Sequence, residues 1–167
     1  DTVITKNIPR LRFPEFDSDW SKRELKDFAK NIAYGIGSSA KSFDGFNKYL
    51  RITDIDENTN RFKPSPLTSP EGSINEKDGK LVFAGFLIKF SIKDANPFFI
   101  FYQTQRDTYK NWVKVTSVRS GQPGLNVEEL KKFKIVAPEL PEQQKIANFL
   151  TQVDRKIELL ENQQAAL

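Results

Sequence analysis

The last segment of the chain, residues 140–167, has the pattern of a long amphipathic helix. It reads LPEQQKIANFLTQVDRKIELLENQQAAL. Pro141 suits the first turn of a helix, and Glu142 places a negative charge beside the positive end of the helix dipole. Apolar residues then recur at alternating spacings of four and three, the heptad pattern of a coiled coil, at Ile146, Leu150, Val153, Ile157 and Leu160. Such a stripe needs a partner surface, so we expect this helix to pack on another helix, of this chain or of another.

Composition excludes several classes of chemistry. The 167 residues contain no cysteine and no histidine, which removes disulfides, thiolate and imidazole metal ligands, and the commonest general base. No run is long and apolar enough to cross a membrane, and the polar N-terminus has no features of a secretory signal. We therefore expect a cytoplasmic protein. The chain begins with Asp and has no methionine, as expected of a fragment of a longer protein.

Positive charge is concentrated outside this last segment. Residues 140–167 hold three basic and four acidic residues, and the whole chain has a net charge of +4, so residues 1–139 carry +5. A basic body fits an anionic partner such as DNA. An ordinary soluble surface is the alternative, and charge alone favours it.

Residues 1–139 mix strand and helix signals without a repeating strand–helix–strand order. We predict a short helix capped by Ser21, a strand over residues 49–56, and a strand over residues 81–92 with a bend at Gly85. Asn96 is expected to cap a helix that carries an aromatic face as far as Val113.

The remaining signals complete the fold class. Asn126 is expected to cap a short helical turn, and residues 131–137 alternate as a strand. We therefore predict an α+β fold. A curved mixed β-sheet with short helices forms one domain over residues 1–139, and a long protruding helix suited to pairing as a coiled coil follows it over residues 140–167.

Catalytic patterns are weak. The loop at Gly35 lacks the third glycine and the Gly-Lys-Ser/Thr ending of phosphate-binding loops. Glu24 and Glu129 each begin a Glu-x-Lys triplet, as in some nucleases, but no acidic partner strand precedes either. Asp54 and Asp56 lie two residues apart, and no third metal ligand is in view. We predict no catalytic residues and no metal site.

Two loops are better candidates for contact with a polyanion. The first displays side chains that suit base edges and phosphates, namely Arg119, Ser120, Gln122 and Asn126. The second combines small hydroxyl residues with basic ones, namely Lys41, Ser42, Tyr49 and Arg51. An ordinary surface turn explains the first loop equally well, and a flexible loop beside a strand with scattered charges explains the second somewhat better.

Five stretches of the sequence resemble one half of the specificity subunit of type I restriction–modification systems. The stretches are NIPRLRFPEF with Trp20, KRELKDF, YLRITDID, SGQPGLN, and IVAPELPEQQKIANFL with DRKI. The segment LPEQQKIA is the most specific of them. Together they span nearly the whole chain, as a single target recognition domain plus the start of a conserved helix.

The resemblance implies a non-catalytic reader of DNA. Such subunits have two recognition domains, each reading half of a bipartite target, separated by long helices that pair as a coiled coil. They bring adenine methyltransferase subunits and restriction subunits to the DNA. S-adenosylmethionine, ATP and Mg²⁺ would be bound by those partners, so this chain needs no cofactor.

Two departures from the family pattern leave alternatives open. A segment usually found before AGFLIK is expected to be missing near residues 76–81, and residue 167 lies within the conserved helix, so we expect either a fragment or a half-subunit. A half-subunit would pair with a copy of itself and read a symmetric site. The alternative functions are a protein–protein scaffold without direct DNA contact and a metal-dependent nuclease.

Overall fold

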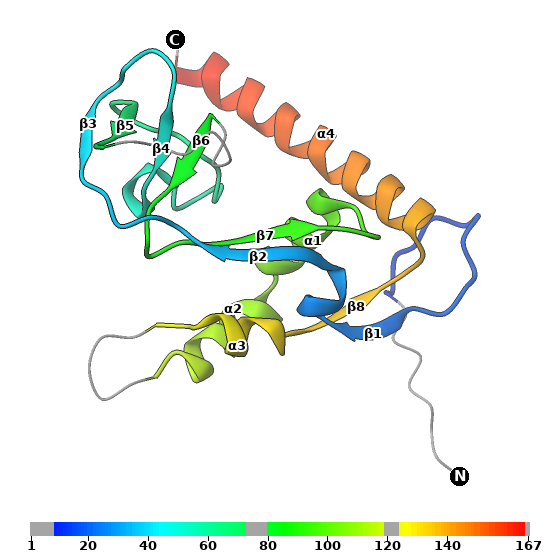
Figure 1. The fold of residues 1–167 in the computed structure, drawn as a ribbon. Coiled ribbons are helices and arrows are strands. Elements are labelled where there is room, and N and C mark those ends of the chain that lie inside the picture. Colours follow the sequence, from blue (N-terminus) through cyan, green and yellow to red (C-terminus); the bar gives the residue numbers. More distant parts are fainter. Residues whose placement is uncertain (1–8, 73–79, 119–123, 166–167) are drawn as a thin grey trace. The chain divides into compact units, whose positions relative to one another are not determined.

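The chain divides into two compact units in a computed structural model that describes residues 9–72, 80–118 and 124–165 (Figure 1). Unit 1 combines residues 1–30 with residues 92–167, and unit 2 is formed by residues 31–91. The boundary expected between residues 139 and 140 is a functional one, and it stays a prediction.

In unit 1, two strands from opposite ends of the sequence pair with each other. Strand β1 (Ser21–Glu24) is antiparallel to β8 (Lys134–Ala137), with Ser21 opposite Ala137 and Glu24 opposite Lys134 (Figure 1). The helix predicted to start at Ser21 is therefore wrong, because a distant strand claims this backbone. The capping box lies three residues later, between Glu24 and Asp27, and it starts the 3₁₀ helix η1 (Leu25–Phe28).

Three helices connect these strands in unit 1. Helix α1 (Pro97–Gln105) is followed by α2 (Asp107–Thr116) and α3 (Val127–Lys131). Asn96 caps α1 as predicted, since its side chain accepts a hydrogen bond from the Phe99 N–H at 3.0 Å. The single helix expected through Val113 is in fact two helices, because Arg106 between them has an extended backbone.

The core of unit 1 is built from apolar side chains of these elements. Its buried apolar residues are Leu25, Phe28, Phe99, Ile100, Phe133, Ile135, Ala137 and Ala147. The aromatic face predicted after Asn96 contributes to it, as the rings of Tyr109 and Trp112 each lie 5.0 Å from that of Phe133. The strand predicted over residues 131–137 begins only at Lys134, because α3 extends to Lys131. Phe133, Ile135 and Ala137, predicted to face one side, are all buried.

Unit 2 consists of short strands that pair two by two. Strand β2 (Ala29–Tyr34) pairs with β7 (Ile88–Ile92). Strand β3 (Ala40–Ser42) pairs with β5 (Thr68–Pro70). Strand β4 (Lys48–Leu50) runs parallel to β6 (Leu81–Phe83). The predicted bend at Gly85 is confirmed between β6 and β7. Gly35 permits a close approach, since a Cβ there would lie 2.0 Å from the carbonyl oxygen of Ala84.

The strand predicted over residues 49–56 ends early, at Leu50. The 3₁₀ helix η2 (Ile52–Asp54) follows it. The Asp54 carboxylate accepts hydrogen bonds from the backbone N–H of Arg51 at 2.8 Å and from its guanidinium, and this closes the turn. A side chain that bonds the nearby backbone competes with the strand ladder.

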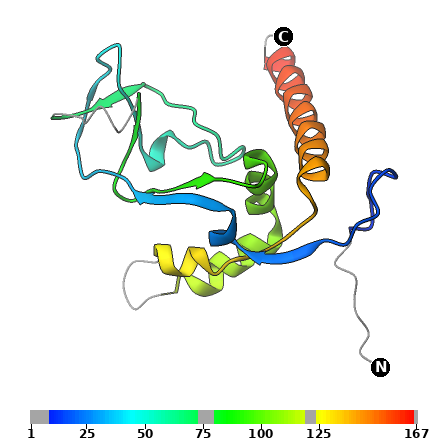
Figure 2. The same ribbon diagram turned by 45° about the vertical axis from the view of Figure 1, so that its right-hand side comes forward.

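The long final helix, α4 (Leu140–Ala165), is unbroken, as the sequence predicts. In Figures 1 and 2 its C-terminal half extends as a rod beyond the other elements of unit 1. Within the described residues, no helix is both long enough and apolar enough to cross a membrane.

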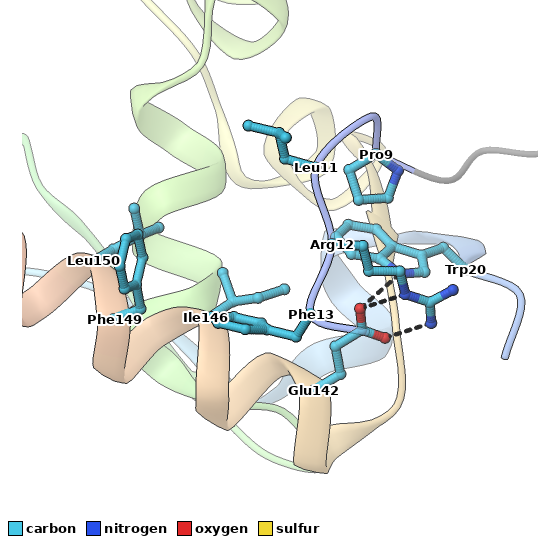
Figure 3. A pocket seen from close by; sticks show the side chains of 9 residues that line it. All are labelled: Pro9, Leu11, Arg12, Phe13, Trp20, Glu142, Ile146, Phe149 and Leu150. Carbon is cyan, nitrogen blue, oxygen red and sulfur yellow. Dashed lines mark hydrogen bonds and ion pairs between the residues drawn. The ribbon is translucent and has the colours of Figure 1, made fainter. Parts of the chain in front are cut away.

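A buried carboxylate anchors the first turn of α4. Glu142 is 1 % exposed, and its two oxygens accept hydrogen bonds from Nε and Nη2 of Arg12, each at 2.7 Å (Figure 3). The indole N–H of Trp20 donates to the same carboxylate at 3.3 Å. Glu142 and Asp17 and Asp19 raise the pKa of Arg12, with the Glu142 hydrogen bonds as the main cause. Residues 9–20, which we call the N-terminal arm, are thus bound to the start of α4 by these hydrogen bonds.

Two glutamines continue this anchor. The Gln143 side chain accepts from the backbone N–H of Asn96 at 3.0 Å and donates to the Pro138 carbonyl at 2.8 Å. The Gln144 side chain accepts from the Asn96 amide at 2.7 Å. Asn96 therefore serves both α1 and α4, and the two helices share one corner.

We predict that Glu142→Gln lowers the midpoint of thermal unfolding by several degrees, because it leaves the partly buried Arg12 cation without a counter-charge. Differential scanning calorimetry measures this. Glu139→Gln is the matched control, since Glu139 is exposed just before the helix. Equal midpoints for the two variants would show that the ion pair does not hold the arm.

Candidate nucleic-acid interface

Two predicted DNA-contacting residues, Lys41 and Ser42, are exposed on β3 of unit 2. Their backbones pair with Ser69 and Thr68 of β5. The short two-stranded ladder fixes the direction of both side chains, because residues on a strand alternate between its faces. Lys41 and Ser42 therefore point to opposite faces of the ladder, and each alone has a group that suits contact with a phosphate oxygen.

Tyr49, in contrast, is buried, and this corrects the prediction that it contacts DNA directly. Its side chain is 2 % exposed, and its hydroxyl donates to the carbonyl of Ser38 at 2.8 Å and lies 3.3 Å from that of Ile36. The ring is part of the core of unit 2. Tyr49 therefore shapes the loop that leads into β3 and offers no surface to a ligand.

Arg51 is committed to a partner within unit 2. Its guanidinium donates to the two oxygens of Asp54 at 3.0 and 2.7 Å. The hydrogen bonds from Arg51 hold the pKa of the Asp54 carboxyl below its usual range, and the same pair raises the pKa of Arg51. Because the charge is neutralised in place, Arg51 has less to offer a phosphate than a free cation would.

The other predicted loop is covered only at its end. Arg119, Ser120 and Gln122 lie outside the described residues. Asn126 is exposed and caps α3 as predicted, accepting from the Glu129 N–H at 2.9 Å while Glu129 accepts from the Asn126 N–H at 2.9 Å. This capping box fixes where the loop rejoins unit 1.

The predicted apolar stripe of α4 is half-buried at its start and exposed further along. Ile146 and Leu150 are half-buried, whereas Val153, Ile157 and Leu160 belong to the exposed residues. The Tyr102 hydroxyl of α1 donates to Asp154 at 2.7 Å. From residue 155 onward every described side chain of α4 is exposed, so this part of the stripe has no cover from unit 1.

A pocket of about 370 Å³ lies between the N-terminal arm and the start of α4 (Figure 3). Its lining is mostly apolar and comprises Pro9, Leu11, Phe13, Trp20, Ile146, Phe149 and Leu150, with Arg12 and Glu142 beside them. The Phe13 ring meets that of Phe149 edge-on at 6.0 Å. Since Ile146 and Leu150 line the pocket and also belong to the stripe, the two surfaces are continuous.

The carboxylates considered as nuclease or metal-binding candidates from the sequence are bound to other residues. Glu24 pairs with Lys134 and Lys26, which lower the pKa of its carboxyl to about 2. Asp56 accepts two hydrogen bonds from Thr59 at 2.8 Å. In the parts of the chain that the structure describes, no three acidic side chains come together in a way that would hold a metal ion.

The contact between the N-terminal arm and α4 was not predicted. Arg12 was assigned no partner, and Glu142 was interpreted only as a favourable charge in the first turn. The pattern carries no signal for this pair, because the two residues are 130 positions apart. It also gave Gln143 and Gln144 no contacts, although both lie in the segment that carries the strongest family resemblance.

Comparison with known proteins confirms that resemblance. The sequence model described as type I restriction modification DNA specificity domain matches residues 17–167. The chain therefore belongs to this family of DNA specificity domains.

Two solved structures show a similar fold. The HsdS subunit from Thermoanaerobacter tengcongensis is 15 % identical, with a TM-score of 0.56 over 87 % of this chain and 45 % of that one. A chain from a structure of the type I R-M system, described for its complex assembly and conformational transition, is 17 % identical, with a TM-score of 0.57 over 91 % and 43 %. The present chain thus spans less than half the length of each. The predicted α+β class with a long final helix is confirmed.

We predict that Tyr49→Phe destabilises the protein by about 1–2 kcal/mol, because the carbonyl of Ser38 loses its donor in a part-buried site. Urea denaturation followed by circular dichroism measures this. Tyr34→Phe, on a mostly exposed tyrosine, provides the comparison. An unchanged midpoint for Tyr49→Phe would mean that the hydroxyl does not hold the loop.

Proposed function

We propose that this chain is a DNA sequence-specificity component of a type I restriction–modification complex. It reads one half of a bipartite target and holds the methyltransferase and restriction subunits in place. The family match over residues 17–167 is the observation that carries this proposal.

Both units carry a small net positive charge, which fits a polyanionic partner but does not distinguish it from an ordinary soluble surface. Residues 31–91 hold eight basic and seven acidic residues, for a net of +1, and the remaining residues account for the other +3 of the total of +4. Phosphate contacts supply affinity without sequence information, whereas contacts to base edges select the sequence. We assign the first role to Lys41 and Ser42, and the second to Arg119, Gln122 and Asn126 with Ser120 beside them.

We assign no catalytic step to the chain. Methyl transfer from S-adenosylmethionine and ATP-driven restriction, which uses Mg²⁺, belong in this proposal to the partner subunits. Support comes from the carboxylates of the Glu-x-Lys triplets, since Glu24 pairs with lysines and Glu129 caps α3.

Helix α4 is proposed to pair with a second specificity half, either a further domain or a second copy of this chain. Ile157 is 49 % and Leu160 is 50 % exposed, and exposed apolar residues at heptad spacing favour a helical partner. A helix lying along this stripe would also cover the mouth of the pocket at Ile146 and Leu150.

A protein–protein scaffold that touches no DNA is the second candidate, and the exposed stripe of α4 favours it as well. The two candidates differ in one property, since only a DNA reader shows binding that discriminates sequence and weakens with salt.

The sequence preference of binding tests whether this chain reads DNA. We expect Gln122→Ala to change the preferred sequence, and Lys41→Ala to weaken binding to all DNA and make it less sensitive to salt. Fluorescence anisotropy on the complex of this chain with its methyltransferase, with target and shuffled duplexes over a series of salt concentrations, measures both. If both variants bind as the wild type does, our assignment of the DNA surface is wrong.

Association of the protein in solution tests whether α4 pairs with a second specificity half. We expect Ile157→Asp to weaken pairing of α4 at least about tenfold, because it places a charge in an apolar seam. Analytical ultracentrifugation over a concentration series detects this. Asn162→Asp adds the same charge outside the seam and should leave pairing unchanged. Equal effects of the two variants would point to general electrostatics and not to the stripe.

A further inference from the structure

In unit 2, the turn between β3 and β4 is held in one conformation by side chains. The Asp44 carboxylate accepts hydrogen bonds from the backbone N–H groups of Phe46 at 2.9 Å and Asn47 at 2.8 Å. These N–H groups, with Asn47 as the larger cause, lower the pKa of the Asp44 carboxyl to about 2. Gly45 takes a positive φ of 84° at the apex, a conformation that glycine adopts at no cost.

A buried serine on β5 links the two ends of the turn. The Ser69 hydroxyl of β5 accepts from the Asp44 N–H at 2.9 Å and donates to the Asn47 carbonyl at 2.6 Å. Ser69 is fully buried. One hydroxyl thus joins both ends of the turn to the neighbouring strand. The backbone of the turn is therefore held in one conformation before any ligand binds.

The side chain that the turn displays is Phe46. It is 64 % exposed, and the ammonium of Lys80 lies 5.5 Å from the centre of its ring. Lys48 begins β4, directly after the turn, and its backbone N–H donates to the Lys80 carbonyl at 2.9 Å. Both lysines are exposed. The Phe46 ring therefore lies beside the Lys80 cation, and a second exposed lysine, Lys48, is hydrogen-bonded to Lys80 through the backbone at the start of the adjacent parallel strand.

An aromatic ring flanked by lysines matches the chemistry of duplex DNA, in which apolar base surfaces lie between rows of phosphates. Phenylalanine contacts thymine methyl groups in the major groove and wedges between base steps in the minor groove. We propose that Phe46 contacts a base of the DNA target and that Lys48 and Lys80 bind the phosphates beside it. This inference rests on the proposed function and adds a sequence-selective residue to it.

A preformed turn gives such a contact an energetic advantage. A mobile loop loses conformational freedom when it binds, whereas a turn already closed by Asp44 and Ser69 has little left to lose. The Asp44 carboxylate stays ionised, because hydrogen bonds from neutral N–H groups stabilise its charge and do not cancel it. The positive charge that attracts a phosphate to this turn therefore comes from Lys48 and Lys80.

Phe46→Ala in the complex of the full chain with its methyltransferase tests the inference. The probes are a duplex whose adenine methylation in the source cell depends on this gene, and the same duplex with its recognised bases shuffled. We expect affinity for the target to fall about tenfold, while affinity for the shuffled duplex and the salt dependence stay unchanged. Lys80→Gln should weaken both duplexes alike and reduce the salt slope by about one.

Two matched variants serve as controls. Phe86→Ala removes an aromatic side chain that is 86 % exposed on another turn of unit 2. Lys63→Gln removes the same charge as Lys80→Gln outside the turn. Phe46→Ala and Lys80→Gln must each exceed their control. Since Phe46 is exposed, circular dichroism and thermal melting should show an unchanged fold.

The outcomes separate this inference from the proposed function. If the wild-type complex distinguishes target from shuffled DNA and Phe46→Ala binds the target as tightly, the inference is overturned and the proposed function stands. It is also overturned if Phe86→Ala has an equal effect, or if Phe46→Ala loses the methyltransferase and not the DNA. If the wild type shows no discrimination, the proposed function fails and this inference falls with it.

Discussion

The ion pair between Arg12 and Glu142 anchors the first turn of α4 to the rest of unit 1. Burying a carboxylate is costly unless it is paired and hydrogen-bonded, and Glu142 meets both conditions through Arg12 and the indole of Trp20. Gln143 adds a second anchor on the next residue, through Asn96 and the Pro138 carbonyl. The arm, α1 and the first turn of α4 therefore depend on the same few atoms, and a change at one of them affects the other two.

Helix α4 is anchored at its start, and its apolar stripe is exposed further along. Ala147 of α4 is buried, and the Tyr102 hydroxyl of α1 donates to Asp154 of α4, so contact between the two helices reaches Asp154. Past that point the helix has no cover within unit 1, and its apolar residues at Ile157 and Leu160 are exposed. A rod that is rigid at its base and apolar toward its tip keeps a fixed geometry with respect to unit 1, which is what a spacer between two DNA-reading halves needs.

Much of the local structure could be predicted from the sequence, because its causes are local. The heptad pattern predicted α4, and Asn96 and Asn126 were recognised as caps from the residues that follow them. The helix predicted at Ser21 was wrong, because strand β8, more than a hundred residues away, decides that backbone. Tyr49 was placed on the surface for a similar reason, since its hydroxyl partners on the loop at Ser38 have no pattern in the sequence. Long-range pairing is what a single sequence reveals least.

Residues that carry the family resemblance differ from residues proposed to contact DNA. The segment LPEQQKIA carries the strongest resemblance to the family, yet its side chains in the structure hold the fold together, as Glu142 and Gln143 show. In the proposed function, recognition belongs to side chains that the fold leaves exposed. Phe46 combines exposure with a turn that Asp44 and Ser69 hold closed. A rigid frame with an exposed side chain is how a fold can stay constant while the base that it reads changes.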